Sequence, residues 1–278
     1  MRDLTARFGR LPVYLLLAVG ALITMGPFLI MVSTSLKPQA YVLETPPQLF
    51  PADATLNNYD TAWTSSGFAR YFLNSTYVTI LSVFGILLLS SMMAFALSRF
   101  EFAGKRVVYW GLLLTLMIPG MMLIVPQFIL AQDLGVINSH AGLVLFYVAG
   151  QLAFSTFLLQ SFFSQIPREL EEAMRMDGAG AWTVYWRLIL PMSKPALATA
   201  GIFVFLSSWD EFIWALTIIS DASLRTLPMA IALFQGQHAT AWGLVFAASV
   251  IAVGPVIVVF VTFQRYFVAG IAEGAVKG

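Results

Sequence analysis

The sequence predicts an all-α integral membrane protein with six transmembrane helices, from its composition and the lengths of its apolar stretches. Hydrophobic residues make up 59% of the 278 residues and charged residues 10%, whereas charged residues are about 25% of a typical soluble domain. Because a helix rises about 1.5 Å per residue, roughly 20 apolar residues cross a hydrocarbon core about 30 Å thick. Six stretches reach this length, at approximately 11–33, 71–97, 107–128, 141–163, 196–219 and 241–266.

The basic residues predict the orientation of these helices. If the N-terminus is cytoplasmic, twelve of the 15 Lys and Arg residues fall on the cytoplasmic side, and Lys37, Arg70 and Arg225 fall on the other. Cytoplasmic loops of membrane proteins carry an excess of Lys and Arg. Both termini and the loop at 164–195 are therefore predicted to be cytoplasmic.

Two spans have features of their own. The first follows three arginines and resembles the start of a signal peptide, but its apolar run is long and lacks a small-residue cleavage site. We expect a retained helix there. In the third span, Pro119, Gly120 and Pro126 predict a kink.

The loop at 164–195 is an extended polar stretch between strongly apolar segments, and it predicts a helical hairpin outside the membrane. Pro167 suits the first turn of a helix, and the acidic residues after it lie where negative charge meets the positive end of the helix dipole. Gly178 ends this helix in the prediction. A second apolar run follows, and it is broken by Pro191 and Pro195.

Charged pairs and apolar side chains make the first helix of this hairpin a predicted docking surface. Glu171 and Glu172 can pair with Arg175 at a spacing of four and three residues, or with basic groups of a partner. Apolar residues at other positions offer a compact surface for insertion into a partner; they are Leu170, Ala173, Met174 and Met176.

Polar residues inside the membrane are candidates for a substrate pathway. Trp209, Asp210, Glu211 and Phe212 lie in the middle of the fifth span, where an ionised Asp costs roughly 2.5–3.5 kcal/mol by insertion scales. A ring beside carboxylates suits a sugar. The alternative is that Asp210 and Glu211 brace a helix break or pair with a residue of a partner subunit. Polar residues of other spans are either ligands or interhelical glue; they are Asn74, Tyr77, Gln127, Gln151 and Ser155.

Several kinds of chemistry are not expected. The chain has no Walker A sequence, so ATP binding by that route is excluded. His140 and His238 lie in different predicted outer loops, and the chain has no cysteine, so a metal site is not expected. No predicted span contains a histidine, which leaves an intramembrane hydrolase a weak alternative.

The cytoplasmic loop resembles a known motif. Glu172-Ala173-Met174, Gly178 and the run Leu188-Ile189-Leu190-Pro191 resemble the EAA loop of bacterial ABC-importer permeases, with Met174 and Leu188 replacing Ala and Ile. Further segments look like the second permease subunit of maltose-type carbohydrate importers; they are IPRELEEAMRMDGAG, SRFEFAGKR, NNYDTAW, SSWDEFIWAL and QRYFVAGIAEGAVKG.

The resemblance implies a single domain, 1–278, with the type I ABC importer permease fold, in the bacterial inner membrane. The implied partners are a second permease, two ATP-binding subunits that hold ATP and Mg, and an extracytoplasmic sugar-binding protein, with no cofactor in this chain. The implied coupling residues, which dock on an ATPase, are Glu171, Glu172, Ala173, Arg175, Asp177, Gly178, Leu190 and Pro191.

The resemblance also implies two further contacts with partners. The tail at 267–278 would contact the ATPases through Glu273, Lys277 and Gly278, the alternative being a disordered terminus. The outer loop at 220–240 would reach the binding protein through Gln235 and Gln237.

Two other interpretations remain open from the sequence. An ion-coupled secondary transporter would use Asp210 and Glu211 as proton or sodium sites, but it leaves the EAA-like loop and the tail without a purpose. The loop at 164–195 could also be an amphipathic connector lying on the membrane surface, although such anchors are usually richer in Lys and Arg.

Overall fold

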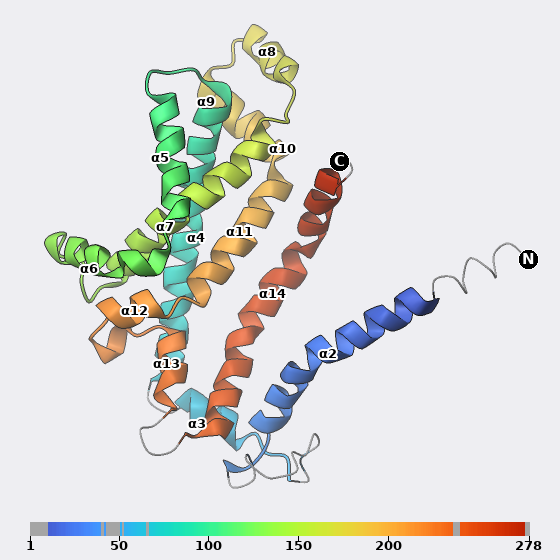
Figure 1. Ribbon diagram of the computed structural model, residues 1–278, viewed down its shortest axis with the longest axis vertical. Coiled ribbons are helices and arrows are strands. Elements are labelled where there is room, and N and C mark those ends of the chain that lie inside the picture. The colour runs from blue at the N-terminus through green and yellow to red at the C-terminus, as the bar shows by residue number, and fades with distance from the viewer. Residues whose placement is uncertain are drawn as a thin grey trace, which may run out of the picture. The chain divides into compact units, whose positions relative to one another are not determined.

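The computed structural model describes residues 11–39, 42, 51, 53–64, 67–235 and 240–275, without the side chains of residue 11 and of residues 267–275. These residues are mostly helical, and the only β-pairing among them is an isolated bridge between Gln235 and Thr240. The predicted all-α class is confirmed. The chain divides into two compact units (Figure 1), one containing Ala230–Gly254 and the residues up to Ala69, the other Arg70–Met229 and the residues from Pro255 onward.

Four predicted spans are single apolar helices long enough to cross a membrane. They are α2 (Leu11–Ser35), α4 (Phe68–Arg99), α7 (His140–Phe163) and α14 (Trp242–Ala275). The backbone of α14 continues as a helix beyond the predicted end of the sixth span at 266, through Ala275. No helix-breaking proline lies between Tyr266 and that end.

The third predicted span is not one helix. It consists of α5 (Lys105–Met117), a short 3₁₀ turn (Gly120–Leu123) and α6 (Ile124–Asp133), and the two parts are bent by 99°. Ile118 has the extended backbone that a residue before proline prefers, with φ −92° and ψ 119°. Pro119 therefore causes the predicted kink, and the result is a break, whereas Pro126 is accommodated in the first turn of α6.

The fifth predicted span is also interrupted. Helix α11 (Lys194–Trp209) ends in the middle of the predicted segment, and α12 (Ile213–Ile218) follows after three residues of non-helical chain. Before α11 come the parts of the loop at 164–195: α8 (Arg168–Met176), α9 (Ala181–Val184), a π-helical turn (Tyr185–Ile189) and α10 (Leu190–Met192). The chain between Ala181–Met192 and Lys194–Trp209 bends by 77°.

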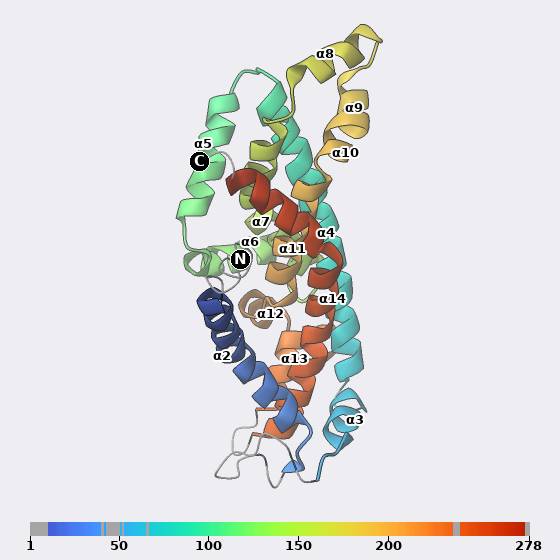
Figure 2. The same ribbon diagram turned by 90° about the vertical axis from the view of Figure 1, so that its right-hand side faces the viewer.

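Helix α7 is the central helix of the second unit, where it contacts α5, α11 and α12. Two apolar cores lie along it. The first joins Ala94 and Phe95 of α4 to Leu159 and Phe163 of α7 and to buried residues of the cytoplasmic loop, which are Ile166, Val184, Tyr185 and Ile189. The second joins Val78, Leu143 and Tyr147 to α6 and α12. Figure 2 shows α8 and α9 at one end of this unit, away from α6 and α12.

The first unit is held by side-chain amides. The Nδ2 of Asn58, in α3 (Asn57–Thr64), donates to the carbonyls of Ser35 and Lys37 at 2.8 Å and 2.7 Å. The Oε1 of Gln39 accepts from the backbone N–H of Gly243 at the start of α14, at 3.0 Å. The outer connection at 35–70 is thereby tied to both α2 and α14, and α13 (Leu227–Leu233) leads from the second unit into the first.

The entry into α7 generates a stability prediction. A Cβ on Gly142 would overlap the carbonyl oxygen of Val136, while a Cβ on Gly150 of the same helix would meet nothing within 4 Å. We expect Gly142→Ala to lower the free energy of unfolding by about 1–3 kcal/mol and Gly150→Ala to change it little. Thermal unfolding of the purified protein measures both variants, and equal stability would contradict the close approach of the Val136 carbonyl to the first turn of α7.

Candidate functional site

The hairpin at 164–195 is built on a helix stop at Gly178. This residue has φ +82°, which only glycine adopts without strain. Its N–H donates to the carbonyl of Arg175, and the N–H of Ala179 donates to the carbonyl of Met174, both at 3.0 Å. This pair of bonds is the Schellman motif that ends many helices. The predicted helix stop at Gly178 is thus present in the structure.

The residues at the tip of the hairpin are exposed, among them the central ones of the EAA-like run. Met176 is 88% exposed and Leu170 is 40% exposed, while Met174 packs against the first apolar core, which contains Phe95 and Tyr185. Further exposed side chains of the hairpin are Glu172, Ala173, Arg175, Asp177 and Pro191, whereas Leu190 is half-buried. The tip therefore offers apolar and charged groups to a partner.

Glu171 differs from its expected place. It is buried, and its Oε1 lies 2.6 Å from Nε of Arg99 at the end of α4. The same guanidinium donates through Nη2 to the carbonyls of Phe163 and Ile166, at 2.7 Å and 2.8 Å. Glu171 thus forms its ion pair with Arg99, whereas the sequence had suggested Arg175 or a basic group of a partner. We call Arg99, Glu171 and these two carbonyls the Arg99 clamp.

A second contact joins the hairpin to α4. The hydroxyl groups of Tyr185 and Ser91 lie 2.8 Å apart in a buried hydrogen bond. The Tyr185 ring packs against Phe95 of α4 and against Trp182 and Trp186 of the hairpin, with centroids 5.1 to 5.6 Å apart. The loop after α4 is held differently, by an exposed pair of Lys105 and Glu101 at 2.7 Å, whose hydrogen bond lowers the pKa of the Glu101 carboxyl.

Glu211 braces the interruption between α11 and α12. Its Oε1 accepts from the N–H of Trp214 at 2.7 Å, and its Oε2 accepts from the N–H of Ala215 at 3.0 Å. The Tyr147 hydroxyl donates to Oε2 at 2.7 Å. These bonds satisfy donors at the start of α12, which has no preceding helical turn. Of the two roles the sequence left open, Glu211 has the bracing one.

The neighbours of Glu211 have different surroundings. Trp209 is 3% exposed. Its ring stacks on that of Phe205, with centroids 5.6 Å apart, and packs edge to face with Phe72, with centroids 5.7 Å apart. Phe212 packs against the second apolar core, which contains Leu143 and Tyr147. Asp210, in contrast, has an exposed side chain at the end of α11. Within this predicted group, Asp210 is therefore the exposed residue.

The polar candidates of other spans have different surroundings. Asn74 donates through Nδ2 to the carbonyls of Ser223 and Arg225, both at 2.9 Å, so it holds the loop after α12. Tyr77 is exposed and lies beside His140, with ring centroids 5.9 Å apart. The remaining candidates are partly or fully buried; they are Gln127, Gln151 and Ser155.

The outer loop also contains an acidic turn. Asp221 accepts the N–H of Ser223, and this bond holds the pKa of the Asp221 carboxyl below its ordinary value. Gln235 is exposed at the bridge to Thr240. Other predicted contacts lie outside the described residues: Gln237, Lys277, Gly278 and the side chain of Glu273.

The helical spans, the exposed hairpin and the break at Asp210 define a membrane permease subunit. A family profile, the binding-protein-dependent transport system inner membrane component, matches residues 86–273. The trehalose/maltose transport system permease protein MalG of Thermococcus litoralis is 36% identical over 271 residues, or 95% of this chain and 97% of that protein. The diacetylchitobiose uptake system permease protein NgcG of Streptomyces coelicolor is 35% identical over 264 residues, or 94% of this chain and 87% of that protein.

A solved structure has the same fold. In the crystal structure of a bacterial ABC transporter involved in the import of the acidic polysaccharide alginate, one chain matches with a TM-score of 0.80 and 26% identity, over 95% of this chain and 98% of that chain. The protein therefore belongs to the family of inner membrane components of binding-protein-dependent transport systems. It is a permease subunit of an ABC importer.

The brace at Glu211 generates a prediction that separates scaffold from pathway. Glu211→Ala leaves two backbone N–H groups and the Tyr147 hydroxyl without their acceptor, and each such loss costs about 1–3 kcal/mol. We expect a clear fall in the melting temperature of the purified complex. Asp210→Ala, at the exposed neighbour, is expected to leave it nearly unchanged. Normal stability with lost uptake in Glu211→Ala would instead assign this carboxylate to the pathway.

Proposed function

We propose that this chain is the permease subunit of an ATP-driven sugar importer and forms half of its translocation pathway. The exposed tip of the hairpin carries the proposal. It combines the exposed EAA-like residues Glu172 and Ala173 with Gly178 in a left-handed conformation. The buried ion pair of Glu171 and Arg99 joins it to α4. The carbohydrate class is supported by relatives named for the transport of trehalose and maltose and of diacetylchitobiose.

The proposed complex has four kinds of subunit. A second, similar permease would complete the pathway, and two cytoplasmic ATPases would hold ATP and Mg, since this chain has no Walker A sequence. An extracytoplasmic binding protein would deliver the sugar, which agrees with the family's description. Both termini and the hairpin would be cytoplasmic, as the excess of basic residues favours.

In the proposed mechanism of alternating access, closure of the ATPases on ATP displaces the hairpin tip. The displacement reaches α4 and α7 through the Arg99 clamp and the hydrogen bond between Tyr185 and Ser91. Buried charged contacts transmit such a movement well, because separating them would leave a charge unpaired in a dry environment. The hairpin and both helix ends would then move together and open the cavity to the outside.

For the pathway we propose Asp210 as the residue of the interrupted fifth span that meets the sugar. Its carboxylate can accept hydrogen bonds from sugar hydroxyls, and Tyr77 adds an exposed ring. Trp209 is buried against Phe72 and Phe205, so its role is to hold the break in place. An ion-coupled carrier that uses Glu211 is not favoured, because this carboxylate is bonded to α12 and Tyr147.

The coupling role predicts the behaviour of two hairpin variants. Glu172→Lys reverses an exposed charge at the tip, and Gly178→Val strains a residue with φ +82°. Both should lower ATP-driven sugar uptake at least about tenfold in vesicles that contain the assembled importer, with or without an ionophore. Gly180→Ala is the matched control, since Gly180 has an extended backbone and open space around it. Wild-type uptake by both variants would overturn the coupling role.

The Arg99 clamp predicts a loss of coupling that stability alone does not explain. Glu171→Met leaves a buried guanidinium unpaired, which costs about 3–5 kcal/mol, whereas joint replacement of both ions by apolar residues is often neutral. We therefore expect Arg99→Met with Glu171→Met to fold stably but to transport slowly while ATP hydrolysis continues. The ratio of sugar transported to ATP hydrolysed measures this effect.

The exposed pair of Lys105 and Glu101 provides the control for that experiment. Breaking an exposed ion pair costs about 0–1 kcal/mol, so Glu101→Gln should leave the transport ratio unchanged. If the apolar double variant recovers both stability and the full transport ratio, the clamp contributes to folding and not to coupling.

A further inference from the structure

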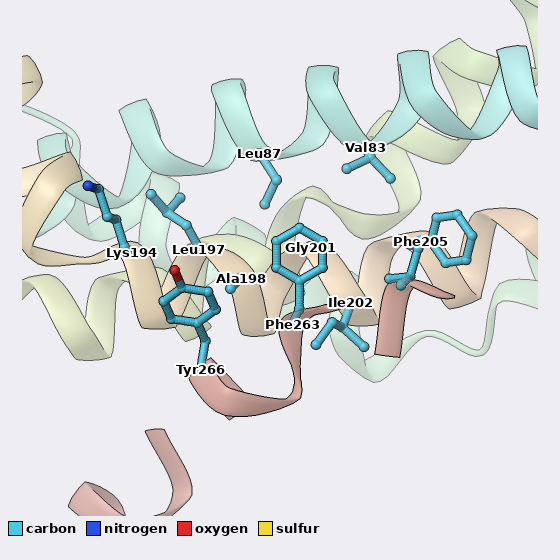
Figure 3. A pocket seen from close by; sticks show the side chains of 11 residues that line it. Val83, Leu87, Lys194, Leu197, Ala198, Gly201, Ile202, Phe205, Phe263 and Tyr266 are labelled. Carbon is cyan, nitrogen blue, oxygen red and sulfur yellow. The ribbon is translucent and has the colours of Figure 1, made fainter. Parts of the chain in front are cut away.

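An apolar groove of about 390 Å³ lies between α4, α11 and the second half of α14. Figure 3 shows its lining, with side chains from all three helices around an elongated space. The apolar part is lined by Val83 and Leu87 of α4, by Leu197, Ala198, Gly201, Ile202 and Phe205 of α11, and by Val259 and Phe263 of α14. The two polar residues of the lining are Lys194 and Tyr266.

The polar groups gather at one end of the groove. Figure 3 shows Lys194 and Tyr266 at the same end of the groove, with Phe205 at the opposite end. Arg265 donates from Nη2 to the Tyr266 hydroxyl at 3.0 Å, which adds a second cation to this end. In the part of the chain that the structure describes, neither Lys194 nor Arg265 lies within ion-pairing distance of a carboxylate.

The length of the groove matches one leaflet of a bilayer. From Lys194 to Phe205, α11 advances 11 residues, or about 16 Å at the rise of an α-helix. This is about half of a hydrocarbon core about 30 Å thick. The polar end coincides with the start of α11, directly after the hairpin. In the proposed topology it therefore lies at the cytoplasmic headgroup level.

We propose that this groove binds one anionic phospholipid of the cytoplasmic leaflet. An acyl chain fills the apolar part, and the phosphate lies against Lys194, the Tyr266 hydroxyl and Arg265. Basic pockets between transmembrane helices on the cytoplasmic side are sites for anionic headgroups. Two cations at one end of an apolar groove match a phosphate above an acyl chain, so the charges favour a lipid.

The test titrates the purified complete importer in detergent with phosphatidylglycerol and, separately, with zwitterionic phosphatidylethanolamine, and counts bound lipid by native mass spectrometry. We expect tighter binding of phosphatidylglycerol by the wild type. Lys194→Gln should weaken it roughly fivefold, and Lys194→Arg should restore it. Ala198→Leu places a larger side chain in the groove and should abolish that binding while the subunits stay assembled. Lys105→Gln, a cytoplasmic-side lysine outside the groove, is the charge control.

Two results would overturn the proposal. One is equal binding of phosphatidylglycerol by the wild type, Lys194→Gln and Ala198→Leu. The other is loss of subunit assembly in Ala198→Leu, which would make the groove a contact with the second permease. The inference rests on the proposed topology, and its failure is separable from that of the proposed function, because an importer with ATP-driven uptake and no phosphatidylglycerol preference contradicts only the lipid site.

Discussion

A buried charge at the end of α4 sets the arrangement of the hairpin against α4 and α7. Removing the Arg99 guanidinium from water is costly unless it finds an anion and hydrogen-bond acceptors. The anion is Glu171 of the hairpin, and the acceptors are the carbonyls of Phe163 and Ile166. The last carbonyls of a helix lack partners within it and carry its partial negative charge. One side chain therefore caps α7 and fixes the position of α8.

The two broken spans also need hydrogen-bond partners for backbone groups that a membrane cannot satisfy. Lipid offers no hydrogen bonds, so a helix that restarts at membrane depth needs acceptors for its first N–H groups. At α12 the Glu211 carboxylate supplies them, with Tyr147 of α7 as a further donor to it. At the break after α5, Pro119 has no N–H to satisfy, and a short 3₁₀ turn leads into α6.

Much of the fold followed from local signals, and the parts that did not involve residues far apart in the sequence. Apolar length predicted the spans, and the spacing around Gly178 predicted the helix stop. The partner of Glu171 could not be predicted, because Arg99 lies on another helix and the nearer Arg175 satisfied the spacing rule. Asn74 was a candidate ligand or interhelical contact, and its amide binds the backbone of a loop whose position no local pattern reveals.

The two apolar cores indicate how a movement at the hairpin reaches the outer side in the proposed mechanism. Both cores contain residues of α4 and α7, so these helices are fastened together at each end. Helix α11 contacts α7 but ends at Trp209, and three non-helical residues separate it from α12. Because a packed pair of helices resists bending while a non-helical segment absorbs changes in backbone angles, we expect relative motion in the proposed mechanism to concentrate at this break. Asp210, the residue proposed to meet the sugar, lies exposed there.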